Sequence, residues 1–130
     1  MKYMLLIYAA EDAWTNDERE ECYAASTRLV HELNDAGKFL GAAPLHPAAT
    51  ATCVRVRDAR RLVTDGPFTE AREQLGGYFL IEARDLDEAL AIAARIPAAA
   101  KGTVEVRPVI DVPHLPQPSD QETPLATAAL

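Results

Sequence analysis

Apolar and polar residues follow two different periods along this chain, and the changes of period mark its elements. Lys2–Tyr8 is apolar over the length of a strand, which is typical of a buried β-strand. Apolar residues then recur every three or four positions within Cys22–Ala36, which predicts an amphipathic helix. A second helical stripe occupies Leu86–Ile96 and ends at Pro97.

The two predicted helices also have predicted ends. Thr15 and Glu18 match the capping box, in which each side chain accepts a hydrogen bond from the backbone of the other residue. Asp85 stands at the equivalent position before the second helix. Gly37 is the expected stop of the first helix, because glycine readily adopts the left-handed conformation found there.

Three further core strands complete the pattern. Lys38–Ala43 and Gly77–Ala83 are apolar runs of strand length, and Thr103–Val112 places Val104 and Val106 on one face. The order is strand, helix, strand, hairpin, strand, helix, strand. It predicts an α+β fold, a ferredoxin-like sandwich whose antiparallel sheet carries its helices on one face.

A hairpin and a connector lie between the two halves. Thr50–Arg57 alternates between an apolar and a wetter face, Asp58–Arg60 is expected to form the loop, and Arg61–Thr64 the return strand. The turn Asp65–Phe68 follows. Glu70–Leu75 is then predicted to form about one and a half helical turns, with Thr69 as N-cap and Gly76-Gly77 as the end.

The predicted sheet requires cover on both faces. Met4–Tyr8 and Tyr78–Ile81 are apolar on both sides, whereas the helices cover one side only. A second copy of the chain is the simplest cover, and two-fold dimers are the commonest homo-oligomers. We therefore expect a homodimer, with a small-molecule pocket between the two sheets or at their shared rim.

Length and charge limit the classes of function. The 130 residues fit one domain at 1–112, followed by a proline-rich C-terminal tail at 113–130. The formal net charge of −7 argues against direct binding of nucleic acid, which depends on clustered basic residues. No apolar run is long enough to span a membrane, so a cytoplasmic protein is expected. Cys22 and Cys53 are predicted to be buried free thiols, and neither a metal nor a cofactor is expected.

The candidate site residues gather around the connector. An aspartate that opens a turn often accepts a hydrogen bond from the backbone N–H two residues ahead. For Asp65 that residue is Pro67, which has no N–H. The Asp65 carboxylate either fixes the turn or contacts a ligand. His46, in a turn flanked by prolines, is the histidine expected to approach it. The other ligand-binding candidates are Thr69, Glu70 and Tyr78.

Several motifs in a fixed order give the chain a family resemblance. The matching residues are Asp65-Gly-Pro-Phe68, Glu70, Glu73, Leu75-Gly-Gly-Tyr78, Asp85-Leu-Asp-Glu-Ala89, Val104-Glu-Val-Arg-Pro108 and the opening Met1–Tyr8. With these motifs the chain resembles the YCII-related family, specifically its DGPF branch, over about residues 1–110. The resemblance implies a dimeric α/β barrel whose activity is largely unassigned. It also implies an association with extracytoplasmic-function sigma factors, which are often encoded beside or fused to such proteins.

Enzymatic proposals for the wider family use a histidine on the first helix and an aspartate before the proline that closes the second. At the matching positions this chain departs from the family it resembles, with Ser26 in place of the histidine and Ile96 in place of the aspartate. Neither residue supports the same proton transfer, because serine is a poor base unaided and isoleucine has no ionisable group. A His–Asp mechanism is therefore not expected here.

Three hypotheses about function remain open. The first is a homodimeric module that binds or senses a small molecule, linked to a sigma-factor system. The second is a cofactor-free enzyme of the lyase, isomerase or hydrolase type, with Asp65 and His46 as acid and base. The third is an interaction partner without any pocket. Whether the protein is an enzyme stays open at this point.

Overall fold

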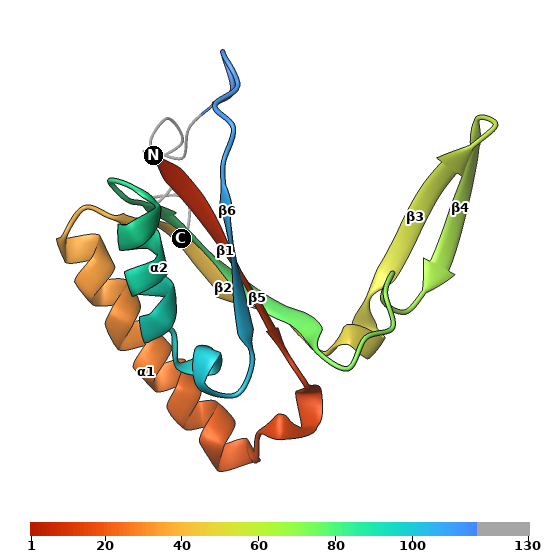
Figure 1. Cartoon of the computed structure of the whole chain (residues 1–130). Coiled ribbons are helices and arrows are strands. Elements are labelled where there is room, and N and C mark those ends of the chain that lie inside the picture. The colour runs from red at the N-terminus through yellow and green to blue at the C-terminus, as the bar shows by residue number, and fades with distance from the viewer. Residues whose placement is uncertain (117–130) are drawn as a thin grey trace, which may run out of the picture.

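A computed structural model describes residues 1–116 of the chain, in which two helices cover one face of a four-stranded antiparallel sheet (Figure 1). The sheet has the order β2-β5-β1-β6, and a separate two-stranded sheet pairs β3 with β4. The strands are β1 (Lys2–Ala9), β2 (Phe39–Pro44), β3 (Thr52–Arg57), β4 (Arg60–Asp65), β5 (Gln74–Glu82) and β6 (Thr103–Pro108). The helices are α1 (Asn16–Asp35) and α2 (Leu86–Arg95), with short 3-10 turns η1 (Glu11–Ala13), η2 (Ala48–Thr50) and η3 (Pro97–Ala100). The predicted ferredoxin-like α+β sandwich is confirmed, while the predicted tail lies outside the described residues after its first four.

Both helices begin and end where their caps predict. The Thr15 hydroxyl accepts a hydrogen bond from the Glu18 amide at 3.1 Å, and the Glu18 carboxylate accepts one from the Thr15 amide at 2.9 Å. Asp85 likewise accepts from the amide of Glu88 at 2.9 Å. Gly37 follows α1 with φ of +73°, which glycine adopts without steric cost. Local sequence therefore determines these boundaries.

The hydrophobic core lies between the sheet and the helices. Leu5 of β1 and Ile81 of β5 are both fully buried at its centre. Leu29 and Leu33 of α1 and Ile92 of α2 close over them. Because side chains alternate along a strand, the neighbours of these core residues point to the opposite face.

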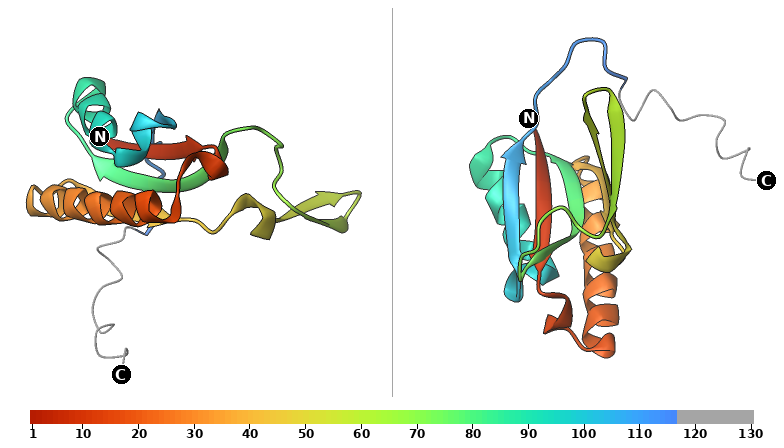
Figure 2. Two further views of the ribbon diagram at one scale, coloured as in Figure 1. Left: turned by 90° about the horizontal axis from the view of Figure 1, so that it is seen from below. Right: turned by 90° about the vertical axis from the view of Figure 1, so that its right-hand side faces the viewer.

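That opposite face of the sheet is apolar and uncovered by the described part of the chain. Met4 and Leu80 are paired across β1 and β5, and Leu6 is paired with Tyr78 in the same way. All four side chains remain partly exposed. The right-hand view of Figure 2 shows both helices behind the sheet and none in front of it. Within residues 1–116 the second face of the sheet is therefore without cover, as expected.

The predicted hairpin does not join the main sheet. β3 and β4 form a projecting two-stranded ribbon, residues 52–65, which we call the arm. Its two-residue turn has positive φ at both Asp58 (51°) and Ala59 (62°), the geometry that suits the twist of a tight hairpin. In Figure 1 the arm stands on the side of the sheet opposite the helices, and Figure 2 agrees.

The predicted helical turns over Glu70–Leu75 are wrong. This segment bends irregularly, and β5 already begins at Gln74. The Gln74 side-chain amide donates to the carbonyls of Thr69 at 3.0 Å and Ala71 at 2.8 Å. These side-chain hydrogen bonds stabilise the bend. Gly76 and Gly77 then lie within β5 rather than ending a helix. A Cβ on Gly77 would lie 2.9 Å from the Ala43 carbonyl oxygen, so glycine allows β2 to approach.

The last strand is shorter than predicted. β6 ends at Pro108 rather than at Val112. Proline has no N–H to donate to a neighbouring strand, so regular pairing stops there. One further backbone bond, from the Val109 amide to the Lys2 carbonyl at 2.8 Å, holds the chain beside β1 before it leaves the sheet.

Candidate functional site

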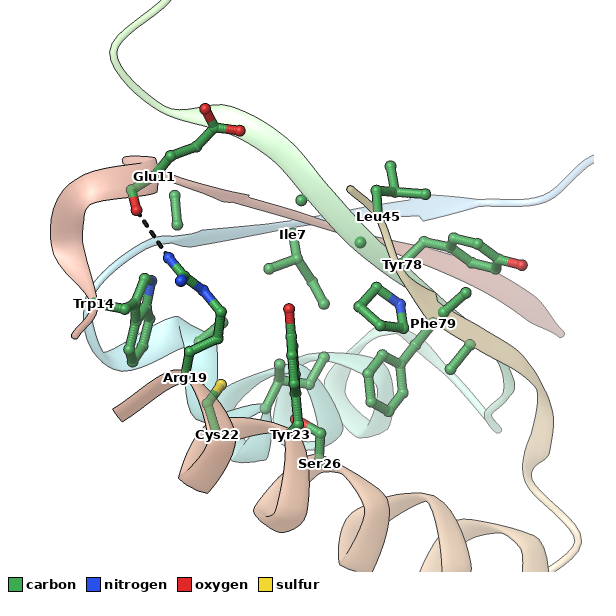
Figure 3. A pocket seen from close by; sticks show the side chains of 18 of the residues that line it. Ile7, Glu11, Trp14, Arg19, Cys22, Tyr23, Ser26, Leu45, Tyr78 and Phe79 are labelled. Carbon is green, nitrogen blue, oxygen red and sulfur yellow. Dashed lines mark hydrogen bonds between the residues drawn. The ribbon is translucent and has the colours of Figure 1, made fainter. Parts of the chain in front are cut away.

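A cavity of about 660 Å³ lies between α1 and the sheet (Figure 3). Ile7 and Phe79 line it from the sheet, and η3 closes one end through Ala98. Its volume falls in the range of about 300–1,000 Å³ typical of small-molecule sites. The sequence predicts a pocket between two sheets or at their rim, which would need a second copy of the chain. The cavity of the single chain lies instead on the helix side, within one subunit.

The cavity opens where the packing residues of α1 become small. In the second half of the helix, Leu29 and Leu33 fill the space against the sheet. One and two turns earlier, the corresponding positions are Ser26 and Cys22, whose short side chains leave that space empty. The change from leucine to small polar residues along one helix face therefore creates the site.

Arg19 and Tyr23 bring polar groups to this cavity. Both project from α1 into it, with Arg19 nearer its mouth (Figure 3). One Arg19 nitrogen donates to the Glu11 carbonyl oxygen at 3.0 Å, which orients the guanidinium. A guanidinium has five donors, so Arg19 keeps further donors for an acceptor group on a ligand. Neither residue was predicted as part of a site, although Arg19, Cys22, Tyr23 and Ser26 recur at helical spacing and so share one face of α1.

The rim of the cavity is tied together by contacts between distant segments. The Glu11 carboxylate accepts a hydrogen bond from the Ala48 amide at 2.6 Å, which joins the start of η1 to η2. The Lys101 ammonium lies 4.9 Å from the centre of the Trp14 ring and donates to Glu18 at 2.9 Å. These contacts hold Trp14, which lines the cavity, in place.

Cys22 and Cys53 are both free thiols, as predicted, but each is half-buried rather than buried. Cys22 faces this cavity. Burial raises the pKa of the Cys22 thiol above its ordinary value of 9.0, and a hydrogen bond with Ser26 offsets only part of that effect. The thiol is therefore protonated at neutral pH, and the protonated form is not the nucleophile.

Alkylation of Cys22 is expected to be slow near pH 8 and to accelerate only above pH 9.0, because iodoacetamide reacts with the thiolate. The experiment uses a Cys53→Ser background, in which Cys22 is the sole thiol, and follows labelling by mass spectrometry from pH 7 to 10. The urea-unfolded protein is the control and should react faster at each pH. A native midpoint below 9.0 would contradict the proposed environment.

Ser26 and Ile96 both line this cavity. These are the positions at which the family resemblance places a histidine and an aspartate. Ile96 is fully buried after α2, and Ser26 is half-buried on α1. The two positions therefore face the same space here, with an apolar group and a hydroxyl in place of an ionisable pair.

The predicted ligand residues are distributed over two neighbouring cavities. His46 lines the first cavity and also a second one of about 690 Å³ at the base of the arm, which Thr69 lines as well. Tyr78 belongs to the lining of the first, but its ring is directed away from that cavity (Figure 3). Its side chain shares the uncovered sheet face with Leu6.

Asp65 and Glu70 line neither of these two cavities. Asp65 is an exposed residue at the end of β4, paired with Thr52 at the base of the arm. Beyond it, the Gly66 amide donates to the Ala51 carbonyl at 2.7 Å and closes the turn. The pairing of Asp65 with His46 as acid and base remains a prediction.

Two further classes of feature are not found within residues 1–116. Histidine, cysteine and acidic side chains do not gather there in groups of three that could hold a metal ion. None of the helices in the same range combines the length and hydrophobicity needed to cross a lipid bilayer.

Comparison with known proteins places these features in a wider group. The profile of the YCII-related domain matches residues 1–113. An uncharacterised protein of Rhizobium meliloti (strain 1021) is 36% identical over 114 residues, which cover 84% of this chain and 92% of that protein. A solved structure of 5-chloro-2-hydroxyhydroquinone dehydrochlorinase (TftG) from Burkholderia phenoliruptrix AC1100, in complex with 2,5-dihydroxybenzoquinone, matches with a TM-score of 0.56 at 17% identity. That match covers 88% of this chain and 98% of the dehydrochlorinase chain, and it shows a shared fold.

Proposed function

This chain belongs to the YCII-related domain family, and we propose that it binds a small molecule in the cavity between α1 and the sheet. The observation that carries the proposal is the cavity itself, with its apolar floor of Ile7 and Phe79 and its polar wall on α1. Ligand sites commonly combine a largely apolar lining with a few polar groups that fix orientation. The matching ligand is a compact, mostly apolar molecule with an acceptor group for Arg19.

Binding is favoured over acid–base catalysis at this cavity. Ser26 and Ile96 offer no ionisable pair, and the raised pKa of Cys22 keeps its thiol protonated. A cofactor-free enzyme that uses Asp65 and His46 would need a site beyond the cavity lining, because Asp65 is not part of it. We therefore keep binding, or sensing through binding, as the conclusion.

We extend the proposal to a cytoplasmic homodimer that packs through the uncovered sheet face. The support is the apolar surface formed by Met4, Leu6 and Leu80, which the described part of the chain leaves partly exposed. A dimer of this kind would bury the two sheets against each other and keep one cavity in each subunit. Sensing in a sigma-factor system is the corresponding role that the family resemblance favours.

Replacing Ser26 with phenylalanine is expected to abolish ligand binding, because the larger ring fills the cavity from α1. Trp14 is the single tryptophan and lines the same space, so its fluorescence reports occupancy. The probes are a panel of small phenols, aromatic acids and quinones that includes 2,5-dihydroxybenzoquinone, titrated by fluorescence and calorimetry. We expect at least one saturable response, weakened at least about tenfold in the variant, which corresponds to about 1.4 kcal/mol.

Ala24→Phe is the matched control, since it adds the same ring at an exposed position of α1 outside the cavity. It should bind as the wild type does. Binding that survives Ser26→Phe would place the ligand elsewhere. A panel without any response at millimolar concentration would contradict the proposed function for this class of ligand.

A further inference from the structure

One face of the arm is left bare by residues 1–116 of its own chain. Val54 and Val63 are paired across the ribbon, and Val56 follows on the same face. Their exposed fractions are 62%, 57% and 64%, respectively. Three adjacent valines on a regular strand surface form a contiguous apolar patch rather than scattered exposed residues.

The other face of the arm is contacted from within the chain. The Arg55 guanidinium lies 5.4 Å from the centre of the Phe68 ring, which belongs to the connector after β4. The Cys53 thiol donates to the Gly66 carbonyl at 3.3 Å. The connector therefore packs against the Arg55 face and leaves the valine face free.

A ribbon of this kind has little stability by itself. Two strands of six residues, without a third strand or a helix over them, are marginally stable in water. The tight turn at Asp58 and Ala59 favours the hairpin locally, but it buries no apolar surface. Cover on the valine face would supply the burial that the arm lacks.

The position of the arm indicates where that cover comes from. The helices lie on one side of the main sheet and the arm stands on the other, beside the uncovered face (Figures 1 and 2). A subunit that packs on Met4, Leu6 and Leu80 would occupy this side. It would then lie within reach of the arm, whose six-residue strands extend about 20 Å.

Charge also favours a second copy of this chain as the partner. The arm carries four arginines and two aspartates, whereas the whole chain has a net charge of −7. The rest of the chain therefore carries a formal net charge of −9, opposite in sign to the +2 of the arm. Such complementarity steers association and fixes the relative orientation of partners.

We propose that the arm is a dimerisation arm, which lays its valine face, Val54, Val56 and Val63, on the body of a second copy of this chain. The inference rests on the proposed homodimer for the presence of that copy. It adds a second contact region, separate from the main sheet, at which each subunit reaches over the other. The two contacts are related by the same two-fold axis.

The contact is tested directly by photo-crosslinking. The crosslinker p-benzoylphenylalanine replaces Val56 in a mixture of ¹⁵N-labelled and unlabelled full-length protein, and crosslinked peptides are identified by mass spectrometry. Peptides that join a labelled to an unlabelled chain are expected. Crosslinks confined to single chains, or the absence of crosslinks while the protein is dimeric, would overturn the proposal.

The energetic test replaces all three valines with threonine, which keeps strand propensity and removes apolar surface. The dissociation constant of the dimer is expected to rise at least about 100-fold by sedimentation equilibrium, since both arms are affected. Leu62→Thr, on the Arg55 face, is the matched control and should change it less than about threefold.

The outcomes separate this inference from the homodimer on which it rests. A wild type that is monomeric at micromolar concentration overturns both. A dimer whose dissociation constant is unchanged by the valine substitutions overturns the arm alone. Binding of a short DNA or RNA duplex that is lost when Arg55 and Arg57 become glutamine would assign the arm to nucleic acid and also overturn it.

Discussion

Replacing Leu6 with aspartate is expected to make the protein monomeric at micromolar concentration. Leu6 points away from the core onto the uncovered sheet face, where Tyr78 is its cross-strand partner. In the proposed dimer each subunit would bury one new carboxylate in an apolar contact without a partner. Burying an unpaired charge costs several kcal/mol, so the dissociation constant should rise at least about 1,000-fold.

Light scattering after size exclusion, with sedimentation equilibrium across a concentration series, measures this effect. Circular dichroism should show that the Leu6→Asp subunit keeps its secondary structure, because the side chain lies outside the core. Leu90→Asp, at an exposed position of α2, is the control for an added charge and should leave the dimer intact. A variant with the same mass as the wild type would refute the sheet-face dimer.

Replacing Leu5 with alanine is expected to lower the free energy of unfolding by about 2–5 kcal/mol. Leu5 is the sequence neighbour of Leu6 but is fully buried in the core. Removing its side chain loses apolar burial and leaves a void between the sheet and the helices. The loss belongs to the subunit itself, so it should persist in the monomeric Leu6→Asp background.

Urea unfolding of Leu5→Ala in that background measures the core effect without the concentration dependence that dimer dissociation adds. Leu6→Ala is the matched substitution on the other face. In the wild-type background its effect should grow as the protein is diluted toward the dissociation constant, because it acts on association. Equal and concentration-independent effects at the two positions would contradict the division into a core face and an interface face.

Sequence predicted the parts of the fold that local chemistry decides. The capping box of Thr15 and Glu18 fixed the start of α1, and Gly37 its end, because these residues satisfy or permit specific backbone geometry. The helical turns predicted after Thr69 are wrong, because a capping residue and a glycine pair are equally compatible with a bend that leads into a strand. Pairing with the end of β1, where Ala9 is opposite Gln74, extends β5 back to Gln74, a tertiary effect that overrides a short helical preference.

The candidate site was harder to predict, because it depends on space that small side chains leave unfilled between α1 and the sheet. Asp65 drew attention as a carboxylate in a demanding turn, yet the proposed ligand cavity arises where Cys22 and Ser26 stand in place of leucine along α1. Their small size appears in the sequence, but only the opposed sheet shows that the space stays open. His46, selected from its turn, does line both cavities.

The two open edges of the arm also carry a hazard that its sequence counters. Each edge presents unpaired backbone N–H and C=O groups beside exposed valines, which is a template for strand addition and fibrillar aggregation. Arg55 and Arg57 alternate with those valines along β3, and Arg60 and Arg61 open β4. Stacked copies of such a ribbon would align these like charges and repel each other. Arginines at these positions would therefore act as gatekeepers against such stacking while the valine face is exposed.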